Sequence, residues 1–256
     1  MPHFYDHFPL NLQEWALQQP IFFTATAPAR GQHINCSPKG LTSTTFTVFD
    51  ENHAAYLDAT GSGAETIAHL YDNGRITIMF CSFTTKPRIM RLFCTGSVIE
   101  SQDPRFPETI GRMGKAPEEE VMQGIRAVIM LEIWKVQTAC GYAVPTSQEL
   151  SSCGDEKESP YTPDSFRDRD TLTKWIENKV RKNALNDYKM KMNARSLDGL
   201  PALKHARRMN KESLLLGDAK SWISKELDHF WALSLGTLIG IILVVIVQSA
   251  TLGRTT

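Results

Sequence analysis

The chain has 256 residues, of which 42% are hydrophobic. That is enough for one core of about 150 residues, with roughly a hundred residues left for other purposes. The formal net charge is zero, but residues 1–160 carry 12 basic and 18 acidic residues, whereas residues 161–229 carry 15 and 10. An acidic N-terminal region is poorly suited to nucleic acid, whose binding depends on many Lys and Arg contacts with phosphate, so no nucleic-acid partner is expected.

The five cysteines are odd in number and widely spaced, and they include no Cys-x-x-Cys pair. This pattern argues against a disulfide framework and against a zinc site, so reduced thiols and no bound metal are expected. The first residues lack a basic segment followed by an apolar one, so no signal peptide is expected. The N-terminal domain is therefore predicted to lie in the cytosol.

An amphipathic helix is predicted over residues 10–19 and ends at Pro20. Runs with strand character follow it, separated by turn residues such as those at 28–31 and 72–74. Their ranges are 21–27, 33–37, 44–49, 53–57, 75–83, 87–100 and 126–138. We expect the first two pairs to form hairpins and 75–83 and 87–100 to be central. Together the runs favour a small barrel of about six strands over a parallel α/β sheet.

One helix is predicted inside the barrel, over residues 64–71, directly after a glycine-rich loop. The Pro- and Glu-rich residues 102–120 predict at most a short helix. Residues 151–164 read as a polar linker, and 170–192 and 202–225 as helices. We therefore divide the chain into a barrel domain at 1–150, a linker and basic helical extension at 151–229, and a final apolar segment at 230–250.

The final segment, Phe230 to Ala250, reads FWALSLGTLIGIILVVIVQSA and contains no charged residue. About twenty apolar residues are what a hydrocarbon core of roughly 30 Å requires, so the segment is predicted to be a single transmembrane helix and a C-terminal tail anchor. Gly236 and Gly240 form a small-x-x-x-small pair, which suits either a helix–helix contact or ordinary transmembrane composition.

The segment before the anchor is strongly basic: Lys174 to Lys211 holds eleven basic against three acidic residues. This is consistent with a cytosolic N-terminal side. Such a segment suits contact with anionic lipid, and it equally suits a solvated helical face.

Three segments combine turn residues with groups that bind anions: 35–40, 60–66 and 86–91. In the second, backbone N–H groups at the helix start and the hydroxyls of Ser62 and Thr66 would face an anion with the helix dipole behind them. A turn that caps a helix is the alternative for this loop. Lys39, Arg88 and Arg91 would act as ligands only if they converge.

The order of four blocks, HINCSPKG, LDATGSGAETIAHLYDNGRITIMF, KPRIMRLFCTGSV and CGYAVP, resembles the pyridoxamine 5'-phosphate oxidase family, and the similarity extends from about Phe4 to Leu203. The resemblance implies a mainly β fold, the six-stranded FMN-binding split β-barrel, here with added helices. It also implies a homodimer with one flavin mononucleotide (FMN) in each of two interface clefts.

Carried onto this sequence, the resemblance places nine residues at the cofactor. It puts three on the strand beneath the flavin, four near its phosphate or ribityl chain, and two on a later strand. These are Asn35, Ser37 and Lys39; Ser62, Gly63, Glu65 and Thr66; and Arg88 and Arg91. Thr66 stands where true oxidases carry a basic phosphate ligand, and the C-terminal arginine signature for the vitamin substrate is not found, so vitamin oxidation is not expected.

The leading hypothesis is a membrane-tethered FMN oxidoreductase that acts on an unknown small molecule. No catalytic side chain is assigned, because the isoalloxazine ring of a flavin carries the redox chemistry itself. Two alternatives stay open. One is the same barrel with haem or a deazaflavin, and the other is a membrane-anchored interaction protein that has lost its cofactor.

Overall fold

The computed structural model describes residues 2–115, 124–147, 166–167 and 170–220, together with residues 223, 234, 237, 241 and 242. The chain divides into two compact units, Met1–Leu172 and Thr173–Thr256. Each unit is considered by itself below.

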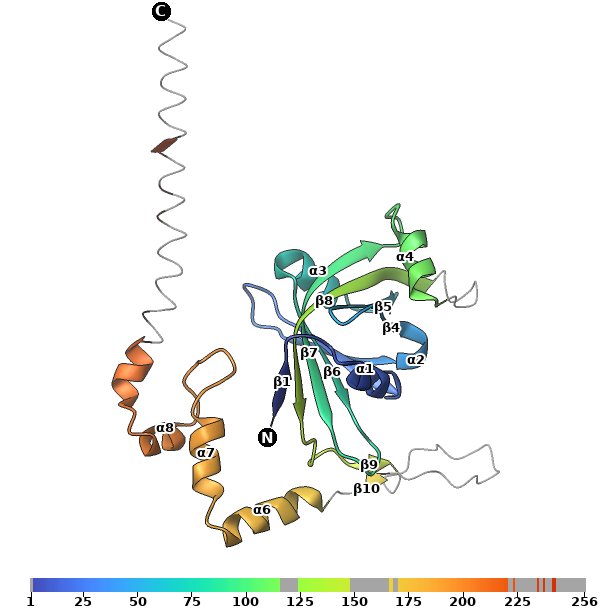
Figure 1. The fold of residues 1–256 in the computed structure, drawn as a ribbon. Coiled ribbons are helices and arrows are strands. Elements are labelled where there is room, and N and C mark those ends of the chain that lie inside the picture. Colours follow the sequence, from blue (N-terminus) through green and yellow to red (C-terminus); the bar gives the residue numbers. More distant parts are fainter. Residues whose placement is uncertain are drawn as a thin grey trace, which may run out of the picture. The chain divides into compact units, whose positions relative to one another are not determined.

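Unit 1 is built on one antiparallel sheet of eight strands, in the order β3-β2-β6-β7-β8-β5-β4, with β1 paired to the end of β8 (Figure 1). The fold is therefore mainly β, as expected, but the prediction of six strands was wrong. The strands are β1 (His3–Tyr5), β2 (Ile21–Thr26), β3 (Asn35–Gly40), β4 (Phe46–Val48), β5 (His53–Ala59), β6 (Arg75–Cys81), β7 (Ile89–Glu100) and β8 (Ile125–Ala139).

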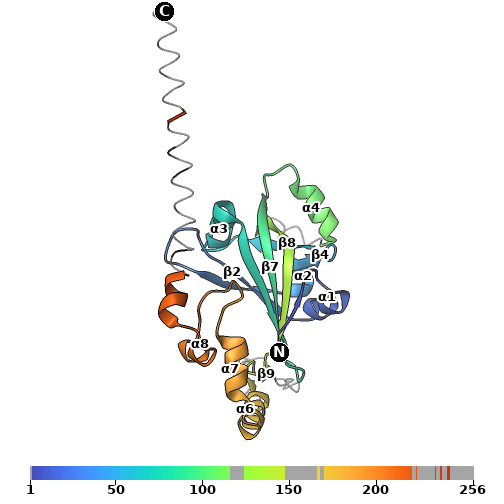
Figure 2. The same ribbon diagram turned by 60° about the vertical axis from the view of Figure 1, so that its left-hand side comes forward.

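Four helices accompany the sheet: α1 (Leu10–Leu17), α2 (Thr42–Thr45), α3 (Glu65–Asn73) and α4 (Phe106–Met113). A two-stranded ribbon of β9 (Thr146–Ser147) and β10 (Phe166–Arg167) completes the described elements of this unit. Figures 1 and 2 show α3 and α4 toward one end of the long β7–β8 pair and the ribbon toward the other. The hairpin of β2 and β3 and the pairing of β4 with β5 confirm the predicted strand pairs.

The sheet curls until its two ends meet. Phe22 on β2 and Phe46 on β4 stand near opposite ends of the strand order, yet their ring centroids are 5.2 Å apart. Tyr56 and Phe80 join the same edge-to-face aromatic cluster. The inner face of the curled sheet thus holds the main core, and the sheet is a half-barrel consistent with a split barrel.

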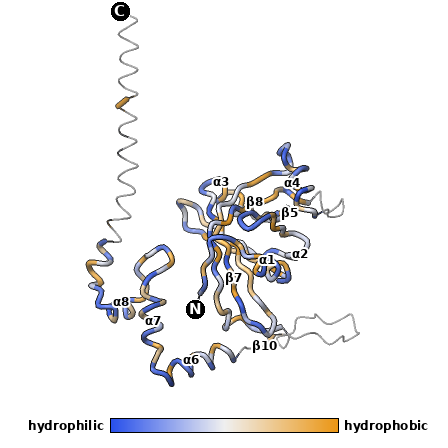
Figure 3. The backbone as a smooth tube through the Cα atoms, in the orientation of Figure 1, coloured by the Kyte–Doolittle hydropathy of each residue, from blue (hydrophilic) through white to orange (hydrophobic). Residues whose placement is uncertain are grey.

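A second core lies on the outer face, beneath α4. Leu57, Val128 and Ile99, from three neighbouring strands, pack there against Phe106 and Met113 of the helix. Alternate residues along these strands therefore serve two cores, which explains why β5 and β8 read as almost continuous apolar runs rather than strict alternations. Figure 3 shows this hydrophobic colour along the strands.

Unit 2 contains α6 (Thr171–Arg181), which begins just before the unit boundary, followed by α7 (Leu185–Asn193), α8 (Lys204–Met209) and a further helical stretch at 214–220. The single helix predicted over 170–192 is thus two helices, broken at Asn183, which has φ 49°. Trp175 packs edge to face on Tyr188, with centroids 4.9 Å apart. Arg207 is buried and pairs with Glu212 and Asp218.

In the described parts of the chain, no helix has both the length and the apolar character needed to cross a membrane. The anchor predicted at Phe230–Ala250 falls almost entirely outside those parts, and the linker predicted at 151–164 does so completely.

Candidate functional site

Three of the predicted site residues share one face of β3. Asn35, Ser37 and Lys39 are half-buried, whereas the residues between them are exposed, as expected for the alternating side chains of a strand. The face is the inner one, because the register pairs these residues with three buried side chains of β2. Those partners are Thr26, Thr24 and Phe22.

Asn35 is the centre of a hydrogen-bond network that links β3, β2 and α3. Its Nδ2 donates to the hydroxyl of Thr66 (2.9 Å) and to that of Thr26 (3.2 Å), and its Oδ1 accepts from Ser37 (2.8 Å). The Thr26 hydroxyl also lies 2.9 Å from Nδ1 of the buried His69. Thr26 already accepts from Asn35, so its own hydrogen is available for His69. The network therefore fixes Asn35 and Thr66 side by side.

The loop before α3 brings the remaining predicted residues of this group to the helix start. Ala64 is the N-cap and forms no side-chain cap bond. Ser62 and Glu65 are exposed, and the Glu65 carboxylate folds back so closely that a Cβ at Gly63 would collide with it. A carboxylate at this position complements the helix dipole and would compete with an incoming anion.

Lys39 takes part in a separate ion cluster. Its Nζ lies 2.9 Å from one carboxylate oxygen of Asp58 on β5, and Nε of Arg126 on β8 lies 2.7 Å from the other. Asp58 is fully buried, while the Lys39 and Arg126 side chains are each 25% exposed. Because β3 and β5 stand near opposite ends of the sheet, the Lys39–Asp58 pair helps to close the half-barrel. The charge of Lys39 is thus already matched inside the protein.

Tyr56 lies next to this cluster, with its ring centroid 6.0 Å from Nζ of Lys39. Burial, followed by the negative charge of Asp58, raises the pKa of Tyr56, so the phenol stays protonated. Its hydroxyl is buried and finds no hydrogen-bond partner among the described residues. Within the part of the chain that the structure describes, the inner face therefore has a neutral hydrogen-bond donor without a partner, the Tyr56 hydroxyl, close to the cations Lys39 and Arg126.

Arg88 and Arg91 lie elsewhere. The Arg88 guanidinium stands 5.2 Å from the ring centroid of Trp15. Arg91 points to the outer face, opposite its fully buried neighbours on β7, and its Nη1 donates to Gln137 at 3.3 Å. The three predicted cationic ligands, Lys39, Arg88 and Arg91, are not brought together.

The group beside α3 can therefore offer neutral donors rather than converging cations. Both amide hydrogens of Asn35 and the hydroxyl hydrogen of Ser37 are used inside the network, so the donors that suit a phosphate are the Thr66 hydroxyl and the N–H groups at the helix start. The oxygens of Asn35 and Ser37 can accept from the hydroxyls of a polyol. The residues fit a flavin tail in this respect, and the cationic part of the predicted phosphate site is not assembled.

Two of the residues missed by sequence reasoning carried a readable signal. Asp58 is an acid inside an otherwise apolar strand, HAAYLDA, which indicates a buried carboxylate in need of partners. His69 lies three residues after Thr66 on α3, so the helical period places both on one face. Arg126 and Thr26 carried no comparable signal, because their roles depend on contacts between distant strands.

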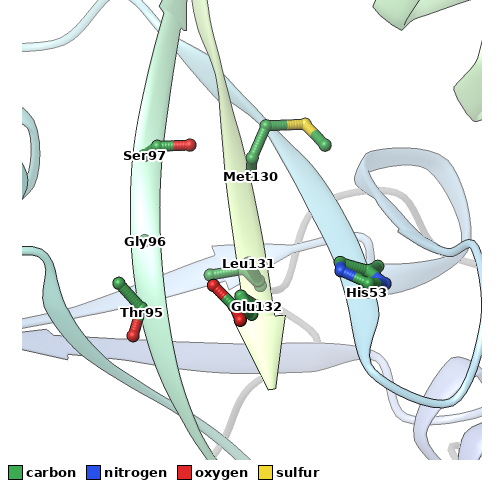
Figure 4. A pocket seen from close by; sticks show the side chains of 7 residues that line it. All are labelled: His53, Thr95, Gly96, Ser97, Met130, Leu131 and Glu132. Carbon is green, nitrogen blue, oxygen red and sulfur yellow. The ribbon is translucent and has the colours of Figure 1, made fainter. Parts of the chain in front are cut away.

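A shallow hollow of about 250 Å³ lies on the outer face, across β5, β8 and β7 (Figure 4). It is lined by His53, Thr95, Gly96, Ser97, Met130, Leu131 and Glu132. The exposed His53 is held by Asp50, and the backbone N–H of Asn52, followed by His53, lowers the pKa of the Asp50 carboxyl. Within the described ranges, no three His, Cys, Asp or Glu side chains are placed to hold a metal ion.

Comparison with known proteins gives one family and one extended relative. The family model described as pyridoxamine 5'-phosphate oxidase matches residues 8–140, which is more than half of the chain. The pyridoxamine 5'-phosphate oxidase family protein ustO of Aspergillus flavus is 47% identical over 224 residues, covering 88% of this chain and 87% of the relative.

Solved structures are similar over about half of the chain. A variant of HupZ from Group A Streptococcus has a TM-score of 0.40 and 18% identity, and covers 52% of this chain and 99% of its own. An FMN-binding protein of Syntrophomonas wolfei has a TM-score of 0.34 and 15% identity, and covers 46% of this chain and 76% of its own.

Proposed function

This chain belongs to the pyridoxamine 5'-phosphate oxidase family, and from that premise we propose that it binds FMN and carries out a redox reaction on a small molecule. The observation that best supports the proposal is the hydrogen-bonded group of Asn35, Ser37 and Thr66 beside the start of α3. These side chains are held in place in advance of any ligand, with the Thr66 hydroxyl free to donate, which lowers the entropy cost of binding. The substrate is expected to differ from the vitamin.

In this proposal neutral groups hold the ribityl chain and the phosphate. Asn35 and Ser37 accept from ribityl hydroxyls on the strand side, and the Thr66 hydroxyl and the backbone N–H groups that follow Gly63 donate to the phosphate at the start of α3. Lys39, Arg126 and Asp58 together leave one net positive charge nearby, which attracts phosphate without a direct contact. The isoalloxazine ring, when bound, supplies the redox chemistry.

Two measurements on the full-length chain test the proposal. Its absorption spectrum should be that of a flavin, and the apoprotein should bind FMN at least about tenfold more tightly than riboflavin. That ratio corresponds to about 1.4 kcal/mol, which one well-placed charged hydrogen bond can supply. Equal affinities would contradict the phosphate assignment. A haem or deazaflavin spectrum, or the absence of any bound chromophore after reconstitution, would favour the two alternatives named above.

A pair of substitutions tests the residues. Thr66→Val removes a hydroxyl that accepts from Asn35 and should weaken FMN binding about fivefold, since a neutral hydrogen bond contributes about 0.5–1.5 kcal/mol. Thr109→Val is the matched control, because Thr109 is an equally buried threonine on α4, far along the chain from β3. Its FMN affinity should be unchanged. Equal losses in both variants would indicate a general loss of stability.

We further propose that the barrel forms a homodimer, as the family resemblance implies. The outer face of β7 and β8 supports this, because Trp134 is 49% exposed and packs on Phe93, with centroids 5.7 Å apart. An aromatic pair exposed on a sheet is a common feature of interfaces. Trp134→Glu should convert the dimer to a monomer in sedimentation. A wild-type protein that is monomeric at micromolar concentration would refute the dimer.

The membrane tether also remains a proposal, and it is supported by the sequence of residues 230–250 alone. The barrel domain is proposed to face the cytosol. Fractionation of cells that express the full chain, or the chain ended before Asp228, tests it. Only the full chain should stay with membranes after a high-salt wash. Retention of the shortened chain would show that another part of the protein is sufficient for attachment.

A further inference from the structure

The helix α6 has an apolar stripe that is only partly covered by the described residues. Leu172, Ile176 and Val180 are spaced four residues apart, so they lie along one side of the helix, and all three are exposed. The opposite side carries Lys174, Asn178 and Arg181 among its residues. A helix with one apolar and one basic side is suited to a boundary between water and an apolar phase.

The described part of unit 2, to which this helix belongs, is basic in composition. Residues 170–220 contain twelve basic and six acidic residues, and two of those acids, Glu212 and Asp218, are already paired with Arg207. The ammonium nitrogen of Lys179 lies over the rings of Trp175 and Tyr188, at 5.7 and 5.4 Å from their centroids, so a basic group on this helix is placed beside an aromatic pair. The partner of this surface must therefore be negatively charged as well as apolar.

Exposed leucines continue toward the end of the unit. Leu215 and Leu216 are 85% and 73% exposed in the helical stretch at 214–220, and Leu197 and Leu200 are exposed between α7 and α8. Figure 3 shows hydrophobic and hydrophilic colours alternating along this part of the chain. Large leucine side chains are rarely left this exposed in groups without a partner.

We propose that unit 2 docks on an anionic phospholipid bilayer, with α6 lying in the interface, its apolar stripe among the acyl chains and its basic residues at the headgroups. A bilayer supplies both a negative surface and an adjacent apolar layer, and no recess is needed to receive so many separate leucines. The apolar segment at 230–250 follows the same unit in the chain, which would place these helices next to the bilayer. The proposal concerns a surface contact and does not depend on the cofactor.

The test uses hydrogen exchange of the full chain in lipid nanodiscs. The probes are discs of phosphatidylcholine alone and discs that also contain phosphatidylserine. In anionic discs, exchange of the amides of residues 171–181 should slow at least about tenfold compared with neutral discs. About 1 M salt should remove most of the difference, because it screens charges beyond about 3 Å.

Two substitutions separate the sides of the helix. Ile176→Asp places a carboxylate on the apolar stripe and should abolish the slowing, whereas Asn178→Gln changes a side chain on the polar side of the same helix without changing its charge and should keep it. Because Ile176→Asp could also loosen the helix, Arg181→Glu with Lys182→Glu provides a second variant. It should reduce the slowing at least about tenfold, since each basic residue near such a surface contributes about fivefold.

Three outcomes would overturn the proposal. If the amides of α6 exchange at the same rate in neutral and anionic discs, the helix does not recognise the negative charge of the lipid. If exchange of α6 in detergent without lipid is as slow as in anionic discs, protein covers the stripe, and the cover is either unit 1 or a second copy of the chain. An unchanged response in the Arg181→Glu, Lys182→Glu variant would show that α6 is not the contact.

Discussion

Replacing Asp58 by Asn should destabilise unit 1 strongly, because Asp58 is the buried carboxylate that joins Lys39 to Arg126. The substitution keeps the shape but leaves two half-buried cations facing a neutral amide. Removing one partner of a buried ion pair costs about 3–5 kcal/mol. Since both cations are 25% exposed, water screens part of the effect, and a loss of about 3 kcal/mol is expected. This corresponds to a fall in Tm of about 6–12 °C for a domain of this size.

Urea unfolding and a thermal scan of the full chain measure the loss. Asp50→Asn is the matched control, because Asp50 pairs with His53 at 2.9 Å, both side chains are more than half exposed, and the pair should contribute little. Lys39→Met removes one of the two cations and leaves Asp58 paired with Arg126, so a smaller loss of about 1.5 kcal/mol is expected. If Asp58→Asn lies within about 1 kcal/mol of the wild type, the cluster does not close the half-barrel, and the reasoning fails.

The remaining predictions concern single side chains. Glu65→Gln should raise the affinity for FMN severalfold and leave riboflavin unchanged in a fluorescence titration, because a carboxylate beside the helix start repels phosphate; a parallel rise for riboflavin would contradict this cause. Burial raises the pKa of the Cys94 thiol, so iodoacetamide should label the exposed Cys36 long before Cys94 in peptide mass spectrometry, and equal rates would disprove the burial. Gly141→Ala should cost at least about 2 kcal/mol in urea unfolding, because Gly141 has φ +60° and a Cβ there would lie 2.8 Å from the carbonyl carbon of Arg88; a loss near zero would show that this turn can shift.

The long strands could be predicted because their residues alternate or run apolar between clear turns. Residues 75–83 and 87–100 became β6 and β7 with small changes at the ends, and 126–138 became β8. The strand expected at 44–49 was wrong at its start, since Thr42–Thr45 forms α2. The hydroxyls of Thr44 and Thr45 both donate to the carbonyl of Leu41, a local bond that competes with strand pairing. β-Branched residues favour strands only when no such bond is available.

The short strand β1 was missed for a different reason. His3–Tyr5 has only three residues, too few for any period to be read, and it forms because the end of β8 presents a free edge to it. Its pairing is a tertiary effect. Because β1 is the eighth strand of the sheet, the number of strands could not be predicted from sequence patterns either.

The candidate site was predictable where chain neighbours make it and unpredictable where distant strands do. The family resemblance put Asn35 and Ser37 on one strand, where the alternation along β3 turns them to the same face, and the glycine loop indicated that Thr66 lies at the helix start. The direction of a long cation cannot be read from sequence, because an arginine or lysine reaches any acid within several ångströms. Lys39 lies on the same face as Asn35 and Ser37, yet its ammonium group forms an ion pair with Asp58.

This last point yields a test of whether the charge of Lys39 reaches the cofactor. In the wild type, Asp58 neutralises one of two cations, so the cluster carries one net positive charge. Asp58→Asn raises that to two, and a phosphate held by Thr66 and the start of α3 should be attracted more strongly. The ratio of FMN to riboflavin affinity should then rise about threefold to tenfold, measured well below the lowered Tm and at low salt, where surface charges are least screened. Lys39→Met should lower the same ratio. If neither variant changes it, the phosphate lies beyond the reach of this cluster, and backbone donors at α3 would have to hold it alone.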